Sequence, residues 1–425
     1  MDSNASSVDM PPSALKSVDD CEKSDNPALS PQMEKYMMFS AICQGFCVLL
    51  NLHSIFMLSN MAPVALGVEN FSGKIVFILE FFACTINTLL FWMNAVKPWF
   101  TVGACIVQGA ANIAQIVVIA TLSGTTGMYA YLGVTAALGV IFGCNSMTSF
   151  AMMAFGPVNH LGAFSFGFAL GGVVPFFFSS ILQNTAFTGN TVEDVRGMMY
   201  CIMGFVAAMS IISGVNLAFY LSREQISKHY NRIKVEGIST VKCTFRAALK
   251  GLKYTWKIVL VDLISYVNLL SFYPGVVPGA MPMDIGRKIM LIGIFQISET
   301  VGRFMAVFID RRWLLCNSLD RVIVLAVCNV GTSVFLVCST LFYSNVFMGH
   351  IVVVTIGVIT LGLVGGYCNS FADKSIEENV PKTLEQNVVV STTTVFKIVA
   401  SVFCAVGSLI STFLVKAFPD GGAGH

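Results

Sequence analysis

The hydrophobic pattern of the chain consists of eleven apolar segments separated by polar stretches. Each segment is near or above the ~20 residues that a membrane-spanning helix needs. The pattern therefore predicts an all-α polytopic membrane protein. The expected spans are Tyr36–Leu58, Lys74–Val96, Trp99–Leu122, Met128–Phe155, His160–Leu182, Met198–Leu221, Trp256–Val277, Lys288–Ile309, Arg321–Tyr343, Val346–Phe371 and Val388–Val415.

Two long polar stretches organise these segments. Residues 1–34 are rich in Ser, Asp and Pro and lack apolar periodicity, so we expect a disordered cytoplasmic tail. The basic stretch 222–255 divides the segments six plus five. We therefore expect the following parts: an N-terminal six-helix bundle over 35–221, a cytoplasmic loop over 222–255, a C-terminal five-helix bundle over 256–416, and a short extracellular tail over 417–425.

Composition supports the membrane assignment. Hydrophobic residues make up 55% of the chain, charged residues only 11%, and the mean hydropathy is +0.75. An ordinary soluble surface needs about 25% charged residues. The net charge of +2 gives no reason to expect a nucleic acid partner. The 13 cysteines are scattered without a C-x-x-C pair, so neither a metal site nor another cofactor is expected.

Lys and Arg are distributed unevenly around the segments. With a cytoplasmic N-terminus, 18 of the 25 lie on the cytoplasmic side and 5 on the other side, while Arg303 and Lys397 lie within segments. Such a bias predicts a cytoplasmic N-terminus and an extracellular C-terminus. The plasma membrane is the default location, because no organelle signal is evident. Asn70 begins a glycosylation sequon on the predicted outer side.

Glu299 and Arg303 are the most informative charges inside the apolar segments. They are four residues apart and near the middle of the eighth segment, so a helix places them on one face. Ionisable residues at membrane depth usually face a bundle interior or a substrate path. The pair either holds the bundle together or lines a cavity that binds a polar solute.

Lys397 and Glu80 are two further ionisable residues within apolar segments. Lys397 is nine residues into the last segment and needs an anion, for which Glu80 and Glu299 are candidates. An ion pair between helices is one interpretation. The other is a role in proton coupling, with Glu80 as the acid partner.

Two segments carry small or bending residues beside polar ones. The seventh contains Asn268 and Tyr273, which we expect to bind the substrate. It continues with Pro274 and Gly275, which in a membrane helix mark bends and gates. The tenth carries Gly366 next to Tyr367 near its cytoplasmic end. Close helix packing and gating are the two alternative interpretations of that pair.

Motifs of other functional classes are missing from the sequence. It contains no H-E-x-x-H, no G-x-S-x-G and no Walker-type phosphate loop, so neither an enzyme nor an ATP-driven pump is expected. It also shows no ring of charges or filter-like loop of a channel. A secondary transporter for a small polar solute fits the pattern better, and a channel is the remaining alternative.

Three motifs, in order on matching segments, resemble those of the equilibrative nucleoside transporter family. They are Phe295 with Glu299, Gly302 and Arg303 in the eighth segment, Phe272-Tyr273-Pro274 in the seventh, and Gly366-Tyr367 with Ser370 in the tenth. The resemblance implies a major facilitator architecture lacking one helix. It also implies alternating-access transport of nucleosides, and in some members nucleobases, down their gradient. A proton-coupled carrier is the alternative.

The resemblance also implies roles for individual residues. Glu299 and Arg303 would bind ribose hydroxyls, while His53 and either Asn145 or Ser146 would contact the base. His53-Ser54 stands where the family usually has Trp-Asn, and Asn145-Ser146 where it offers glutamine. Glu299 replaces the usual aspartate. These departures point to a different base selectivity within the same transport class.

Overall fold

The computed structural model describes residues 31–68, 71–93, 98–154, 160–187, 191–224, 226–227, 245–309, 316–343, 346–379 and 386–417. Within these ranges, eleven helices are long and apolar enough to cross a membrane, which confirms the predicted all-α fold of an integral multi-pass membrane protein. The helices are α2 (Pro31–Leu66), α3 (Ser72–Met93), α4 (Pro98–Thr121), α5 (Gly124–Ala154), α6 (His160–Thr185), α7 (Val192–Leu221), α9 (Phe245–Phe272), α10 (Ile285–Phe308), α11 (Leu319–Leu341), α12 (Ile351–Asn379) and α13 (Gln386–Ala417).

Several helix ends differ from the predicted ones. Residues 31–34, predicted as tail, form the first turn of α2, and residues 245–255, predicted as loop, form the first turns of α9. Polar and basic residues continue a helix beyond its apolar part, so hydropathy alone underestimates such helices. In contrast, α9 ends at Phe272 rather than Val277, because Pro274 cannot continue its hydrogen-bond ladder.

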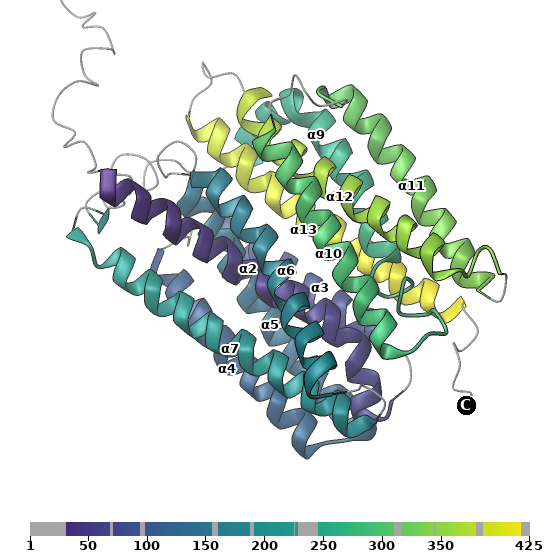
Figure 1. Cartoon of the computed structure of the whole chain (residues 1–425). Helices are drawn as coiled ribbons and strands as arrows, with labels where there is room; N and C mark the ends of the chain where they lie inside the picture. The colour runs from purple at the N-terminus through teal and green to yellow at the C-terminus, as the bar shows by residue number, and fades with distance from the viewer. Residues whose placement is uncertain are drawn as a thin grey trace, which may run out of the picture.

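The helices form two neighbouring halves, α2–α7 (the N-half) and α9–α13 (the C-half), which Figure 1 shows at lower left and upper right. Successive helices run in opposite directions. We call the end of the molecule where α2 begins the N-face, and the end where α13 finishes the C-face. These two ends lie on opposite sides of the molecule in Figure 1.

Glycines bring two helix pairs into backbone contact, one pair in each half. In the N-half, a Cβ added to Gly167 of α6 would overlap the carbonyl oxygen of Ile42 of α2. In the C-half, a Cβ on Gly366 of α12 would overlap the carbonyl oxygen of Glu299 of α10. Small residues permit such close approach between membrane helices. Glu299 therefore lies on a helix whose position is fixed by direct packing against α12.

The hydrophobic cores differ between the two faces. At the C-face, residues of both halves form one continuous core, in which Phe56 and Met61 of α2 join Phe295 of α10 and Val276. At the N-face, each half has its own core, one around Phe164 and the other around Phe371. The two halves are therefore joined by apolar packing at the C-face and packed separately at the N-face.

Contacts between the halves follow two long helix pairs and one shorter contact. Helix α10 packs along α6 and touches α2, and α13 packs along α3. Asn87 of α3 donates a hydrogen bond of 3.1 Å to Ser401 of α13. Phe166 of α6 meets Phe308 of α10 edge-on near the N-face. These contacts enclose the space between the halves from two sides.

Candidate functional site

A cavity between the halves contains about 800 Å³ of empty volume, part of it open to the outside. Eight helices contribute to its wall, four from each half. Its lining residues are Val48, Leu49, Leu52, Glu80, Asn87, Phe142, Ser146, Met147, Phe168, Tyr266, Arg303, Asp373, Ala400, Ser401 and Cys404. The continuous C-face core closes one end of the space between the halves.

The two sides of this cavity differ in chemistry. The C-half contributes a cation, an acid and a phenol, namely Arg303, Asp373 and Tyr266. The N-half contributes mainly apolar side chains, including the rings of Phe142 and Phe168, together with Glu80, Asn87 and Ser146. A ligand with a polar end and a flat apolar end fits this arrangement.

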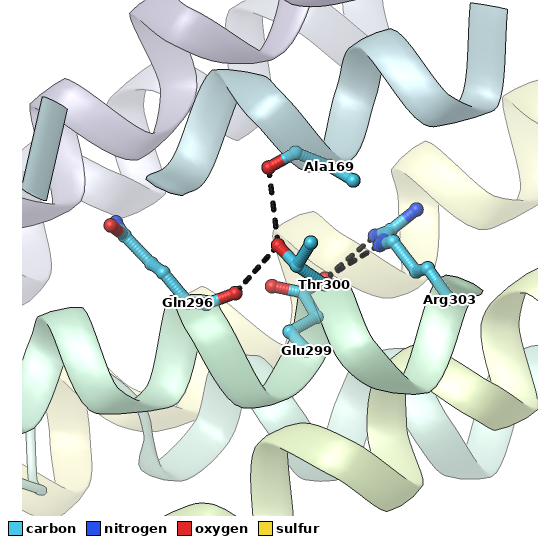
Figure 2. Close-up of polar contacts among 5 residues, drawn as sticks. All are labelled: Ala169, Gln296, Glu299, Thr300 and Arg303. Carbon is cyan, nitrogen blue, oxygen red and sulfur yellow. Dashed lines mark hydrogen bonds and ion pairs between the residues drawn. The ribbon is translucent and has the colours of Figure 1, made fainter. Parts of the chain in front are cut away.

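Glu299 and Arg303 form the ion pair that their spacing predicts (Figure 2). The Arg303 Nη2 lies 2.6 Å from the Glu299 Oε1, and the Arg303 Nε donates to the same oxygen over 3.1 Å. Arg303 lines the cavity, whereas Glu299 is not among the lining residues. Glu299 therefore holds the guanidinium in place from behind, and Arg303 is the member that a ligand can reach.

The same turns of α10 connect the ion pair to the N-half. Figure 2 shows Thr300 between the pair and α6, where its hydroxyl donates to the carbonyl oxygen of Ala169 over 3.1 Å and to that of Gln296 over 2.8 Å. The Gln296 amide donates to the backbone oxygen of His53 on α2 over 3.3 Å. The ion pair is thus one helical turn from two hydrogen bonds that join the halves.

A second, apolar cavity lies beside Arg303 between α6 and α10. Its lining is Phe166, Ala169, Thr300, Val301, Arg303, Phe304 and Phe308. Arg303 is the one charged residue in this wall and borders both cavities. Its guanidinium therefore lies at the boundary between a polar space and an apolar one.

His53 and Ser54 are close to this region but do not line the central cavity. Both are buried on α2, and neither the His53 Nδ1 nor the Ser54 Oγ has a hydrogen-bond partner among the described residues. The His53 ring packs against Phe56. Their predicted contact with a base would require a change in the position of α2, since the lining residues of this helix are Val48, Leu49 and Leu52.

Asn145 and Ser146, the two predicted base contacts of α5, face different surroundings. Asn145 is only 1% exposed and its amide donates to Gln108 of α4, 3.5 Å away. Ser146 lines the cavity. Adjacent residues of a helix point about 100° apart, so the two could not share one role. The structure separates them, and Ser146 is the one that a ligand in this cavity can reach.

The polar residues at the end of α9 belong to the C-face closure rather than to the cavity wall. Tyr273 is buried and stacks on Phe295, with 3.9 Å between the ring centroids. Its hydroxyl donates to the carbonyl oxygen of Ile292 over 3.1 Å. Asn268 donates to the backbone of Asn329 on α11. Gly275 lies against Ser411 of α13, and Pro274 precedes it in the turns that follow α9.

Gly366 and Tyr367 of α12 are packing residues in this structure. Gly366 lies directly against the backbone of Glu299, and the Tyr367 hydroxyl donates to the carbonyl oxygen of Cys316. Tyr367 also belongs to the N-face core of the C-half. This geometry favours the interpretation of close helix contact over gating, and a gating role stays a prediction.

Glu80 lines the cavity, whereas the side chain of Lys397, its predicted partner, lies outside the described residues. The backbone register bears on this predicted pair. Asn87 bonds to Ser401, so Lys397 lies one turn nearer the N-face than that contact, and Glu80 lies two turns nearer the C-face. At ~1.5 Å per residue the two are offset by about 16 Å along the helices. This offset does not favour the predicted pair. Asn70 is likewise outside the described residues.

Several cavity residues were not among the predicted site residues. Phe142 and Phe168 are aromatic residues in apolar segments and carry no sequence signal that separates a ligand contact from a lipid contact. Asp373 falls beyond the predicted end of its segment, because α12 continues to Asn379. Asn87 is one polar residue in an apolar helix, which is the signal that could have identified it.

No family model matches the chain, and no curated protein matches it by sequence. Solved structures do match over nearly its whole length. The proton:xylose symporter XylE bound to 6-bromo-6-deoxy-D-glucose has a TM-score of 0.63 at 11% identity, with 92% of each chain covered. A partially occluded inward open structure of XylE from E. coli has a TM-score of 0.60 at 11% identity, over 93% of this chain and 92% of that one. The nucleoside transporter NupG has a TM-score of 0.51 at 14% identity, over 91% and 92%. The chain has the major facilitator fold.

Proposed function

We propose that the protein is a membrane carrier that moves nucleosides through the central cavity by alternating access. The observation that carries the proposal is the two-sided cavity, with Arg303, Tyr266 and Asp373 on the C-half and the rings of Phe142 and Phe168 on the N-half. A nucleoside combines a hydroxylated sugar with a flat, largely apolar base. Its two parts match the two sides of the cavity.

The sequence motif around the ion pair supports the same ligand class. Phe295, Glu299, Gly302 and Arg303 resemble the motif of equilibrative nucleoside transporters, and the structure brings Arg303 to the cavity wall. In this proposal the guanidinium donates to the ribose hydroxyls, and Glu299 fixes its orientation. Ser146 contacts the base from the N-half. NupG, a nucleoside transporter of similar fold, is consistent with this ligand, while XylE carries xylose.

Alternating access would come from rocking of the two halves around the cavity. The single apolar core at the C-face supports a closed C-face. The two separate cores at the N-face support opening of the cavity at that end, because the halves share no core there. With the excess of Lys and Arg on the side of the N-terminus, we propose that the N-face is cytoplasmic and that the plasma membrane is the host.

Uptake of radiolabelled nucleosides into proteoliposomes tests this function. We expect saturable uptake that other nucleosides inhibit and that an excess of xylose does not. Arg303→Gln should raise the half-saturating concentration at least tenfold, because a charge-assisted hydrogen bond to the sugar is lost. Arg287→Gln, which removes an exposed arginine paired with Asp284 at the C-face, is the matched control and should leave uptake unchanged.

Three results would contradict the proposal. Uptake of xylose without uptake of nucleosides would assign a different substrate. Flux that does not saturate, together with measurable conductance, would indicate a channel. Equal half-saturating concentrations for the wild type and Arg303→Gln would remove Arg303 from the site.

A further inference from the structure

Glu80 is an acid in the cavity wall that the proposed sugar and base contacts do not use. It lies on α3 and is only 4% exposed. Among the residues that the structure describes, no hydrogen bond or ion pair reaches its carboxyl group. The acid of α10 differs in this respect, because Glu299 is paired with Arg303. Glu80 therefore needs another explanation for its place in an apolar helix.

The helix register explains why Glu80 is isolated. Two contacts fix α3 against α13: Gly73 lies against Thr412, and Asn87 bonds to Ser401. Between them, Glu80 lies opposite the stretch of α13 that contains Cys404 and Ser408, neither of which is basic. The basic residues of α13 are Lys397 and Lys416, which lie about 16 Å and about 12 Å away from this level along the helices.

The titratable and charged groups around Glu80 come from its own helix, from the three helices packed on it, and from across the cavity. Helix α5 contributes no charged residue. The bases of α2 are Lys35, in its first turns, and His53, which is buried outside the cavity wall. The bases of α13 are Lys397 and Lys416. On its own helix the other titratable groups are Lys74 and Cys84, and the neighbouring helices α5 and α2 carry Cys144 and Cys47. The cavity wall adds Cys404 of α13 and, across the cavity, Tyr266, Arg303 and Asp373.

Burial without a partner determines which form of the carboxyl group is stable. An ionised carboxylate that leaves water without a counter-charge takes up a proton instead. Arg303 lines the same cavity, but its ion pair is with Glu299, and no ion pair joins it to Glu80 among the described residues. A neutral carboxyl group can stay buried at this depth and offers one O–H donor and one acceptor to the cavity.

We propose that Glu80 is a proton-binding site of the transport cycle. Its carboxyl group takes a proton from water on the side to which the cavity is open, and the halves close over the cavity only when that proton is bound. The same proton returns to water when the cavity opens again. This inference rests on the proposed function, which it extends by a requirement for one proton.

The first test measures protonation without transport. Infrared spectra of the purified protein in lipid nanodiscs are recorded as the pH is raised, and the carbonyl stretch of protonated carboxylic acids is followed. We expect a band in the wild type at neutral pH that Glu80→Gln lacks and that disappears on alkalinisation. Other buried acids contribute equally to both spectra. Identical spectra of wild type and Glu80→Gln at every pH would overturn the proposal.

The second test measures nucleoside uptake into proteoliposomes at a series of pH values. Only neutral Glu80 permits closure, so wild-type uptake should fall as the pH rises, approaching tenfold per pH unit once the carboxyl group ionises. Glu80→Gln is permanently neutral and should show no such fall, while Glu80→Asp should keep it. Glu193→Gln, which changes an exposed acid in the first turn of α7, is the control and should behave like the wild type.

A wild type without pH dependence, or the same dependence in Glu80→Gln, would contradict the proton requirement. Absence of nucleoside uptake by the wild type would instead overturn the proposed function. In that case the infrared band alone decides whether Glu80 binds a proton, so the two failures are distinguishable.

Discussion

The two halves bury their polar side chains in different ways. The N-half joins neutral amides and hydroxyls from four helices, with Gln108 of α4 donating to Ser210 of α7 over 2.9 Å and accepting from Asn145 of α5. The C-half buries a charged pair, Glu299 and Arg303, within one helix. Gln108 and Asn145 lie away from the cavity wall, whereas Arg303 is part of it.

This difference separates groups that fix the fold from groups that are available for binding. Neutral polar groups inside a bundle can satisfy one another at modest cost, and hydrogen bonds between membrane helices stabilise their packing. A buried charge is far more costly and usually marks a functional position. We infer that the N-half network holds its helices in register. In the C-half pair, Glu299 holds the Arg303 cation at the cavity wall.

The largest expected effect comes from breaking the charged pair. Glu299→Ala leaves the Arg303 guanidinium buried without its partner, which should lower the free energy of unfolding by about 3–5 kcal/mol. Equilibrium unfolding in mixed detergent micelles measures this change. The double variant Glu299→Gln with Arg303→Met removes both charges and should recover part of the loss.

The control for this prediction is an exposed ion pair of the same half. Asp320 pairs with Lys257 over 2.7 Å, but its side chain is 73% exposed. Asp320→Asn should cost no more than about 1 kcal/mol. Equal effects of Glu299→Ala and Asp320→Asn would show that the buried pair is well solvated, and the contrast between the halves would then disappear.

The next effect should be the same in both halves. Gly167→Ala and Gly366→Ala each place a methyl group against a backbone carbonyl of the neighbouring helix. Each should therefore lower the free energy of unfolding by about 1–3 kcal/mol. Gly204→Ala and Gly331→Ala, where an added methyl meets no atom within 4 Å, are the controls and should be neutral or slightly stabilising. An unchanged free energy of unfolding for Gly167→Ala, with a lowered one for Gly366→Ala, would show that only the C-half depends on this close packing.

A smaller effect is expected in the N-half network. Gln108→Leu removes the donor to Ser210 and the acceptor for Asn145, and should cost about 1 kcal/mol of stability. The half-saturating concentration for nucleoside uptake should stay within twofold of wild type, because Gln108 does not line the cavity. A tenfold change in that concentration with unchanged stability would show that the network contributes to substrate binding rather than to the stability of the fold.

The smallest effect on stability is expected at Ser146, where the contribution to binding should be visible. Ser146→Ala removes a hydroxyl from the cavity wall and should change the free energy of unfolding by less than about 0.5 kcal/mol. It should raise the half-saturating concentration several-fold for some nucleosides more than for others. A uniform change across bases, measured by competition uptake, would argue against a contact with the base.

Periodicity predicted the ion pair of α10 correctly but could not decide which side chains reach the cavity. The spacing of Glu299 and Arg303 fixed their pairing, because residues four apart always meet on a helix. Asn145 and Ser146 could not be separated in this way, since a sequence does not show which side of α5 meets Gln108 and which meets the cavity. The ends of α2, α9 and α12 were also misplaced, because polar turns continue these helices beyond their apolar parts.

The sequence by itself determined the number of membrane helices, their all-α class and the ion pair of α10, because each depends on local spacing and hydropathy. Only the tertiary structure decided that Arg303 rather than Glu299 reaches the cavity, that Ser146 does so rather than Asn145, and that Glu80 is offset from Lys397. Those relations depend on how distant helices pack and on their register. Residues such as Glu80 and Ser401 are 321 positions apart in the sequence, and no local pattern links them.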